Sequence, residues 1–251
     1  MGPRFKSSYI TRFVFLLAGV AFLVLIAFLA WAGLVAPNQS RLPVPSLDGA
    51  YFAYFNPTQK ALEEEKTGYE LVIASREGGL VGRIPVDPGS VLWSNAGHLA
   101  VVDHDRTVAT VVVNAMARFL VLARLELSPG AEPRWSRDGN KLAFRRPGPL
   151  GDEIVVYDVQ QTQVLPVASP PTFRLRHPLL LFWSPGSDFL YLLNDEGDDV
   201  VLDRLNVAGG EVKVLAQGFP GRRVPGTGLP RMSPDGTRIH LPPPLSLVLD
   251  A

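Results

Sequence analysis

The distribution of apolar residues divides the chain into two regions of different character. From Phe13 to Ala36, 24 residues carry no charged, amide or hydroxyl side chain. As a helix rising 1.5 Å per residue, this run would reach about 36 Å, enough to span a hydrocarbon core of roughly 30 Å. After Pro37, short apolar runs alternate with Gly, Pro, Asp and Asn, and no long stretch shows the helical period of 3.6. The pattern predicts one transmembrane helix followed by an all-β region.

The charges around the apolar run predict its orientation. Arg4, Lys6 and Arg12 precede it, and only Arg41 follows closely. The positive-inside rule therefore places the N-terminus in the cytoplasm, and we expect a single-pass protein of a bacterial inner membrane. A cleaved signal peptide is the alternative, with a small-x-small site at 30–32, but the run is longer than the roughly 7 to 15 residues of an ordinary signal core.

These observations predict four parts. They are a cytoplasmic basic tail (1–12), a transmembrane helix (13–36), a linker (37–45) and an extracytoplasmic region (46–251). Residues assigned to the membrane anchor are Phe13, Leu16, Leu23, Phe28 and Trp31, the last as an interfacial aromatic.

One phrase recurs five times in the second region. Its copies are PSLDGAYFAYF at 45, WSNAGHLAVVD at 93, WSRDGNKLAFR at 135, WSPGSDFLYLL at 183 and MSPDGTRIHL at 232. Their serines are 48, 42, 48 and 49 residues apart, which is the length of one four-stranded propeller blade. Ser and Asp side chains bond to nearby backbone in tight turns and Gly adopts positive φ, so the phrase predicts a turn that begins a strand.

The apolar segments after each turn are predicted strands. They include LVIAS at 71, TVVVN at 110, FLVLARLEL at 119, EIVVYDV at 153, DVVLDRLNV at 199 and EVKVL at 211. We interpret the recurring tryptophans as core residues between neighbouring blades rather than as a ligand cage. The residues assigned a structural role in the repeat are Asp48, Trp93, Trp135, Asp138, Trp183 and Asp235.

These phrases resemble the WSPDG-x-x-(I/L)-A-F repeats of the TolB-like, PD40-type (WD40-like) β-propellers, most closely over 135–144 and 232–239. The resemblance covers roughly residues 45–241. It implies a small β-propeller of about five TolB-like blades, the last one truncated, preceded by one transmembrane α-helix. Departures from the pattern occur in the first copy, where Pro45 replaces Trp, and in the fourth, where Gly186-Ser187 replaces Asp-Gly. The resemblance implies a fold and leaves the function open, because such propellers serve as binding platforms, assembly factors and peptidase domains.

The short fifth copy leaves two ways to complete the ring. In the first, the segment 245–249 supplies a strand that pairs with the first blade or with residues 41–44. In the second, the ring stays open and a partner subunit covers its edge strand, because an exposed apolar edge invites association.

Composition and motifs exclude several classes of function. Lys plus Arg and Asp plus Glu both number 24, so no net basic charge points to nucleic acid. The absence of cysteine excludes disulfides, thiolate metal sites and a cysteine nucleophile. The sequence contains no G-x-S-x-G, HExxH or Walker A motif, and the one G-x-G, at 226–228, lacks a strand-to-helix context. We therefore expect no metal, no cofactor and no catalytic residue.

Two polar clusters are the alternatives to that expectation. Asp103, His104 and Asp105 form the only set we would test for acid-base or metal chemistry, although a polar hairpin turn explains them as well. The acidic run 195–199 suggests calcium but lacks the alternating ligands of an EF-hand loop, which favours a solvated hairpin turn.

The function predicted is therefore binding rather than catalysis. Arginines in two proline-rich connections are the partner-binding candidates: Arg174, Arg176, Arg222, Arg223 and Arg231. We expect a non-catalytic scaffold or accessory subunit of a larger membrane complex of energy-converting or envelope-assembly type. Its partners would be other membrane-protein subunits, with the lipid bilayer around 13–36 and no nucleic acid. The alternative is a propeller enzyme or ligand sensor acting on an extracytoplasmic peptide, glycan or small molecule.

Overall fold

A computed structural model describes residues 42–58, 68–168, 179–196, 199–220, 231–233, 235, 237–240 and 248–250. The chain divides into two compact units, residues 1–42 and 43–251. The described residues belong almost wholly to the second unit, where they form strands, turns and bends and no helix. The all-β prediction is therefore confirmed for this part of the chain.

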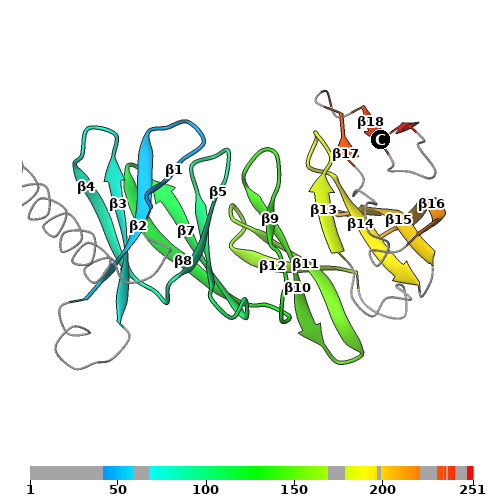
Figure 1. Ribbon diagram of the computed structural model, residues 1–251, viewed down its shortest axis with the longest axis horizontal. Helices are drawn as coiled ribbons and strands as arrows, with labels where there is room; N and C mark the ends of the chain where they lie inside the picture. Colours follow the sequence, from blue (N-terminus) through cyan, green and yellow to red (C-terminus); the bar gives the residue numbers. More distant parts are fainter. Residues whose placement is uncertain are drawn as a thin grey trace, which may run out of the picture. The chain divides into compact units, whose positions relative to one another are not determined.

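Nineteen strands form five antiparallel sheets that follow one another along the sequence (Figure 1). The first sheet contains β1 (Val44–Pro45), β2 (Tyr51–Pro57), β3 (Tyr69–Ser75) and β4 (Leu80–Pro85). The second contains β5 (Gly89–Trp93), β6 (Leu99–Asp103), β7 (Val108–Ala115) and β8 (Arg118–Glu126). The third contains β9 (Arg134–Trp135), β10 (Lys141–Gly148), β11 (Gly151–Asp158) and β12 (Gln163–Ala168).

The remaining strands form the fourth and fifth sheets. The fourth contains β13 (Leu179–Trp183), β14 (Phe189–Glu196), β15 (Asp199–Asn206) and β16 (Val212–Pro220). The fifth contains β17 (Arg231–Met232), β18 (Arg238–His240) and β19 (Val248–Asp250). Each sheet is a simple meander in which every strand pairs with the next one in the chain, as expected for propeller blades.

The last strand corrects one of the expectations for ring completion. Val248 and Leu249 pair with His240 and Ile239 inside the fifth sheet, and Val44 pairs with Ala53 inside the first. For residues 248 and 249 the expectation of a strand added to the first blade is therefore wrong, while 245–247 lie outside the described residues. The physical reason is that β18 lies close to β19 in the sequence. Pairing with β18 closes a much shorter loop than pairing with the first sheet would, and so costs less conformational entropy.

The recurring phrase forms the turn between the first two strands of each sheet. In the third sheet the Ser136 hydroxyl donates to Asp138 Oδ1 at 2.5 Å and accepts the backbone N–H of Lys141 at 2.9 Å. The same pair of bonds joins Ser46 to Asp48 and Tyr51, and joins Ser233 to Asp235 and Arg238. Ser46, Ser94, Ser136 and Ser184 are buried, because each hydroxyl satisfies backbone that the turn would otherwise leave unpaired.

These bonds hold the turn aspartates in the charged state. Donation from Ser46 and from the Ala50 amide lowers the pKa of Asp48. Burial raises the pKa of Asp138, but bonds from Ser136, Asn140 and Ser187 together with the charge of Lys141 outweigh it and lower the pKa. Hydrogen bonds from Ser233 and Thr237 lower the pKa of Asp235 to about 2.

The fourth turn keeps the backbone shape despite its different sequence. Gly49, Gly97 and Gly139 have φ of 69°, 76° and 79°, and Ser187 adopts φ of 61° at the equivalent position. A non-glycine residue is strained there. The Ser187 hydroxyl accepts the backbone N–H of Asp138 at 3.3 Å, which ties the fourth turn to the third.

Neighbouring sheets are joined by tryptophan side chains and a shared apolar core. The indole N–H groups of Trp93, Trp135 and Trp183 donate to backbone carbonyls of the preceding sheet. One apolar cluster lies between each pair of successive sheets. Trp93 belongs to the cluster between the first and second sheets, and Trp183 belongs to the cluster between the third and fourth. Both faces of the inner strands are therefore buried, which explains their continuous apolar sequences.

Gly139→Ala tests the close packing of successive turns. A Cβ at Gly139 would lie 2.3 Å from the backbone nitrogen of Ala96 in the preceding turn, whereas a Cβ at Gly49 would meet nothing within 4 Å. Positive φ costs either alanine variant about 1–2 kcal/mol, and the clash adds about 1–3 kcal/mol in Gly139→Ala alone. Urea unfolding measures both changes, with Gly49→Ala as the matched control, and equal losses of unfolding free energy would contradict the turn-to-turn contact.

Candidate functional site

The cluster at residues 103–105 forms the hairpin turn between β6 and β7. Asp103 Oδ1 accepts the backbone N–H groups of Thr107 at 2.7 Å and Val108 at 3.1 Å, and Oδ2 accepts the Thr107 hydroxyl at 2.9 Å. His104 and Asp105 are exposed. Burial raises the pKa of Asp103, but these bonds outweigh it and lower the pKa. The carboxylate therefore holds the turn, and the three side chains do not converge on a common point.

The other described histidines lie apart from that turn. His98 is half-buried; its Nδ1 accepts the backbone N–H of Asn114 at 3.3 Å, and burial lowers its pKa. His240 is exposed in β18. Across the described ranges, His, Asp and Glu side chains nowhere gather in threes that could hold a metal ion.

Most of the predicted partner-binding residues lie outside the described residues. These are Arg174, Arg176, Arg222 and Arg223, together with the anchor residues Phe13, Leu16, Leu23, Phe28 and Trp31. Arg231 begins β17 and is exposed. In the part of the chain that the structure does describe, no helix has the length and apolar character needed to cross a membrane.

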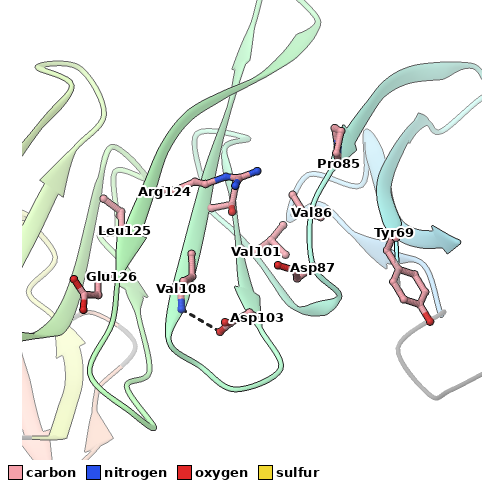
Figure 2. A pocket seen from close by; sticks show the side chains of 12 residues that line it. Tyr69, Pro85, Val86, Asp87, Val101, Asp103, Val108, Arg124, Leu125 and Glu126 are labelled. Carbon is pink, nitrogen blue, oxygen red and sulfur yellow. Dashed lines mark hydrogen bonds between the residues drawn. The ribbon is translucent and has the colours of Figure 1, made fainter. Parts of the chain in front are cut away.

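A pocket of about 590 Å³ lies between the first and second sheets (Figure 2). Its lining residues are Gly68, Tyr69, Pro85, Val86, Asp87, Val101, Asp103, Val108, Thr110, Arg124, Leu125 and Glu126. The guanidinium of Arg124 points from β8 toward the connection that carries Val86 and Asp87, while Glu126 points away from it. The sequence pattern alone does not predict this pocket.

Opposite charges face this pocket without pairing. Among the described residues, neither Arg124 nor Asp87 makes an ion pair within 4.0 Å or a side-chain hydrogen bond. Asp103 is already used by its own turn. A guanidinium and a carboxylate with apolar residues between them can bind a ligand that carries the complementary charges.

The next pair of sheets gives an internal comparison for this pocket. Leu99 and Leu142 each pair with the tryptophan of their own phrase, so Arg146 of the third sheet takes the position of Asp103 in the second, and Arg145 takes that of Val102. Arg145 pairs with Asp152 at 2.8 Å, and Asp152 also accepts the hydroxyl of Ser128 at 2.7 Å. Ser128 belongs to the connection from the second sheet to the third, in the place that Asp87 has after the first. Asp87 therefore stands where Ser128 bonds to the next sheet, and among the described residues Asp87 makes no such bond.

Exposed apolar side chains gather on the last hairpin of the second sheet. Met116, Leu120 and Val121 are 99%, 55% and 46% exposed. Met116 and Ala117 form the turn from β7 to β8 with φ of 54° and 59°, a conformation that normally takes Asn or Gly. Within the described part of the chain, no strand pairs with the outer edge of β8. The sequence signal for this feature is the apolar run at 119–122, which we had assigned only to a strand.

Comparisons with solved structures agree with the propeller-type fold. The chain is similar to TolB from Acinetobacter baumannii, with 18% identity over 88% of this chain and 55% of TolB, at a TM-score of 0.47. It is also similar to Porphyromonas gingivalis dipeptidyl peptidase 4, with 11% identity over 81% of this chain and 36% of the peptidase, at a TM-score of 0.50. Neither the known protein-family models nor the curated protein sequences give a match.

These likenesses extend to the fold alone. Their identities are low, and the chain spans about half the length of the Acinetobacter TolB. The five successive antiparallel sheets define an all-β protein of β-propeller type, and the likeness to the peptidase agrees with that class. Activity does not follow from the fold, because propeller folds carry many unrelated functions.

Asp103→Asn tests the role of the carboxylate in the turn. Because the folded-state pKa lies below its usual value of 3.8, the charge stabilises the fold above that pH, and the effect is lost as pH falls through the folded-state pKa. We expect Asp103→Asn to lower the free energy of unfolding by about 1 kcal/mol at pH 7, and the difference to disappear in strong acid. Denaturant unfolding across pH measures this, with the exposed Asp105→Asn as the control. A difference that is independent of pH would contradict the assignment.

Proposed function

We propose that this protein is a non-catalytic, membrane-anchored scaffold that docks a partner protein on its propeller. The observation that carries this proposal is the apolar outer edge of the second sheet, defined here by Met116, Leu120 and Val121 and called the β8 edge. Exposed apolar side chains beside unpaired strand backbone favour association with another chain. The non-glycine turn at 116–117 adds support, because strained backbone concentrates at functional sites.

The charges of β8 indicate how a partner would pair with it. Arg118 is exposed on the same strand. An extended segment that adds to this edge would satisfy backbone groups through main-chain hydrogen bonds, and its side chains would meet apolar and basic positions. A partner segment that combines apolar and acidic residues fits this surface best.

The proposed setting rests on the N-terminal sequence. The apolar run 13–36 would anchor the chain in a bacterial inner membrane, with the basic tail in the cytoplasm and the propeller on the periplasmic side. The partners would then be other membrane-protein subunits of one larger complex. This arrangement needs no cofactor and no contact with nucleic acid.

The described residues favour docking over acid-base catalysis for the one cluster that suggested chemistry. Asp103 is bonded to its own turn, and His104 and Asp105 are exposed. A general base must lie within hydrogen-bond reach of the proton it removes, in a site that holds substrate beside it. We therefore propose the binding function ahead of an enzyme.

Purification of the full chain from its native membrane in a mild detergent tests the proposal. We expect the wild-type protein to come with the same membrane subunits at fixed stoichiometry. Leu120→Lys/Val121→Lys places two charges in the β8 edge and should reduce recovery of those subunits by about tenfold or more, because burying an unpaired charge is costly.

Leu150→Lys is the matched control, because Leu150 is 72% exposed and lies between β10 and β11, away from the β8 edge. It should leave recovery unchanged, and circular dichroism should show that all variants fold. Purification of the wild-type chain as a lone monomer would refute the proposal, and so would equal recovery from the double variant.

A further inference from the structure

We infer that the pocket between the first and second sheets binds a small zwitterionic ligand of amino-acid or short-peptide type. This site is separate from the apolar side chains of the β8 edge, and the inference does not rest on the proposed function. The ligand carboxylate would bind Arg124, and its ammonium group would bind Asp87.

The two charged residues are suited to this role because they have no partner in the described structure. Arg124 projects from β8, and Asp87 follows β4 in the connection to the second sheet, so the two charges come from different sheets (Figure 2). Neither makes an ion pair. A ligand therefore breaks no existing ion pair when it binds. Guanidinium groups bind carboxylates through two parallel hydrogen bonds, which gives the site both strength and direction.

The pocket lining combines polar and apolar side chains. Val86 and Val101 are buried and line the pocket, with Val108 and Leu125 beside them. The volume of about 590 Å³ lies within the range of roughly 300–1,000 Å³ that is usual for small-molecule sites. These valines and the leucine can contact the aliphatic side chains of a ligand whose charged ends bind Arg124 and Asp87.

The neighbouring pair of sheets supplies an internal comparison. Between the second and third sheets, Ser128 holds the place that Asp87 has after the first sheet, and its hydroxyl donates to Asp152 of the third sheet. Asp87 makes no such bond to the second sheet in the described structure. A ligand ammonium would supply the missing partner of Asp87.

The dipeptide Val-Val is a suitable probe, in three forms: unblocked, N-acetylated and C-amidated. Isothermal titration calorimetry on the full chain in mild detergent measures binding of each form. We expect the unblocked dipeptide to bind, and each blocked form to bind about tenfold or more weakly, since a hydrogen bond to a charged group contributes that much.

Two variants assign the charges to their partners. Arg124→Gln should weaken unblocked Val-Val about tenfold and leave the C-amidated form unaffected, because that form has no carboxylate to lose. Asp87→Asn should weaken unblocked Val-Val about tenfold and leave the N-acetylated form unaffected, because that form has no ammonium group to lose. Arg118→Gln, on the same strand, and Asp105→Asn, on the nearby hairpin, should leave all affinities unchanged, and circular dichroism verifies folding.

The outcomes also distinguish the source of the ligand. Binding of the free dipeptide supports a diffusible ligand. A longer peptide can also be tested for binding through its internal Lys and Glu side chains. If that binding depends on both Arg124 and Asp87, the ammonium and the carboxylate that the pocket binds belong to a partner chain. Failure of every probe to bind at millimolar concentration would overturn the inference, and so would affinities that do not depend on Arg124 and Asp87. Either result leaves the test of the β8 edge untouched.

Discussion

The arrangement of the sheets depends on one repeated hydrogen bond, from a tryptophan indole to the backbone of the preceding sheet. Trp93 donates to the carbonyl of Val44, Trp135 to that of Leu92 and Trp183 to that of Arg134, at 3.0, 2.9 and 2.9 Å. Each acceptor directly precedes the first residue of its own copy of the phrase. Each bond contributes about 1 kcal/mol net, but its larger effect is to fix the separation and register of two sheets whose apolar faces could otherwise slide.

Variation around this constant contact creates the candidate sites. Trp93 and Tyr51 both make edge-to-face contacts with Phe119, and this aromatic group closes one end of the interface between the first two sheets. At the other end, Asp87 takes the place that Ser128 has in the next interface, and a pocket remains. In the fifth copy Met232 replaces Trp, so the indole bond is missing from the link between the fourth and fifth sheets. Among the described residues, an apolar cluster that includes Tyr191 and Ile239 joins those two sheets.

The repeat could be predicted from sequence because its signal is local. Ser, Asp and Gly at fixed offsets specify a turn, and the turn specifies the strand after it, so the sheets and their order follow from the spacing. Ser187 shows the limit of that logic: the fourth turn keeps positive φ without glycine because contacts to Asp138 support it. The pocket could not be predicted, because it depends on residues of two repeats on either side of one interface, such as Asp87 and Arg124, which lie 37 positions apart in the sequence. The pairing of β19 also escaped prediction, since the phrase says nothing of the strands beyond it.

Hydrogen exchange of the indole N–H groups tests the central interaction most directly. In nuclear magnetic resonance spectra of the full chain in detergent, the side-chain N–H signals of Trp93, Trp135 and Trp183 can be assigned by single substitution to Phe. We predict that all three exchange with solvent far more slowly than a free indole, and that their signals disappear together as the propeller unfolds. Exchange of these groups at the rate of free indole in the folded protein would show that the sheets are held in register by something else.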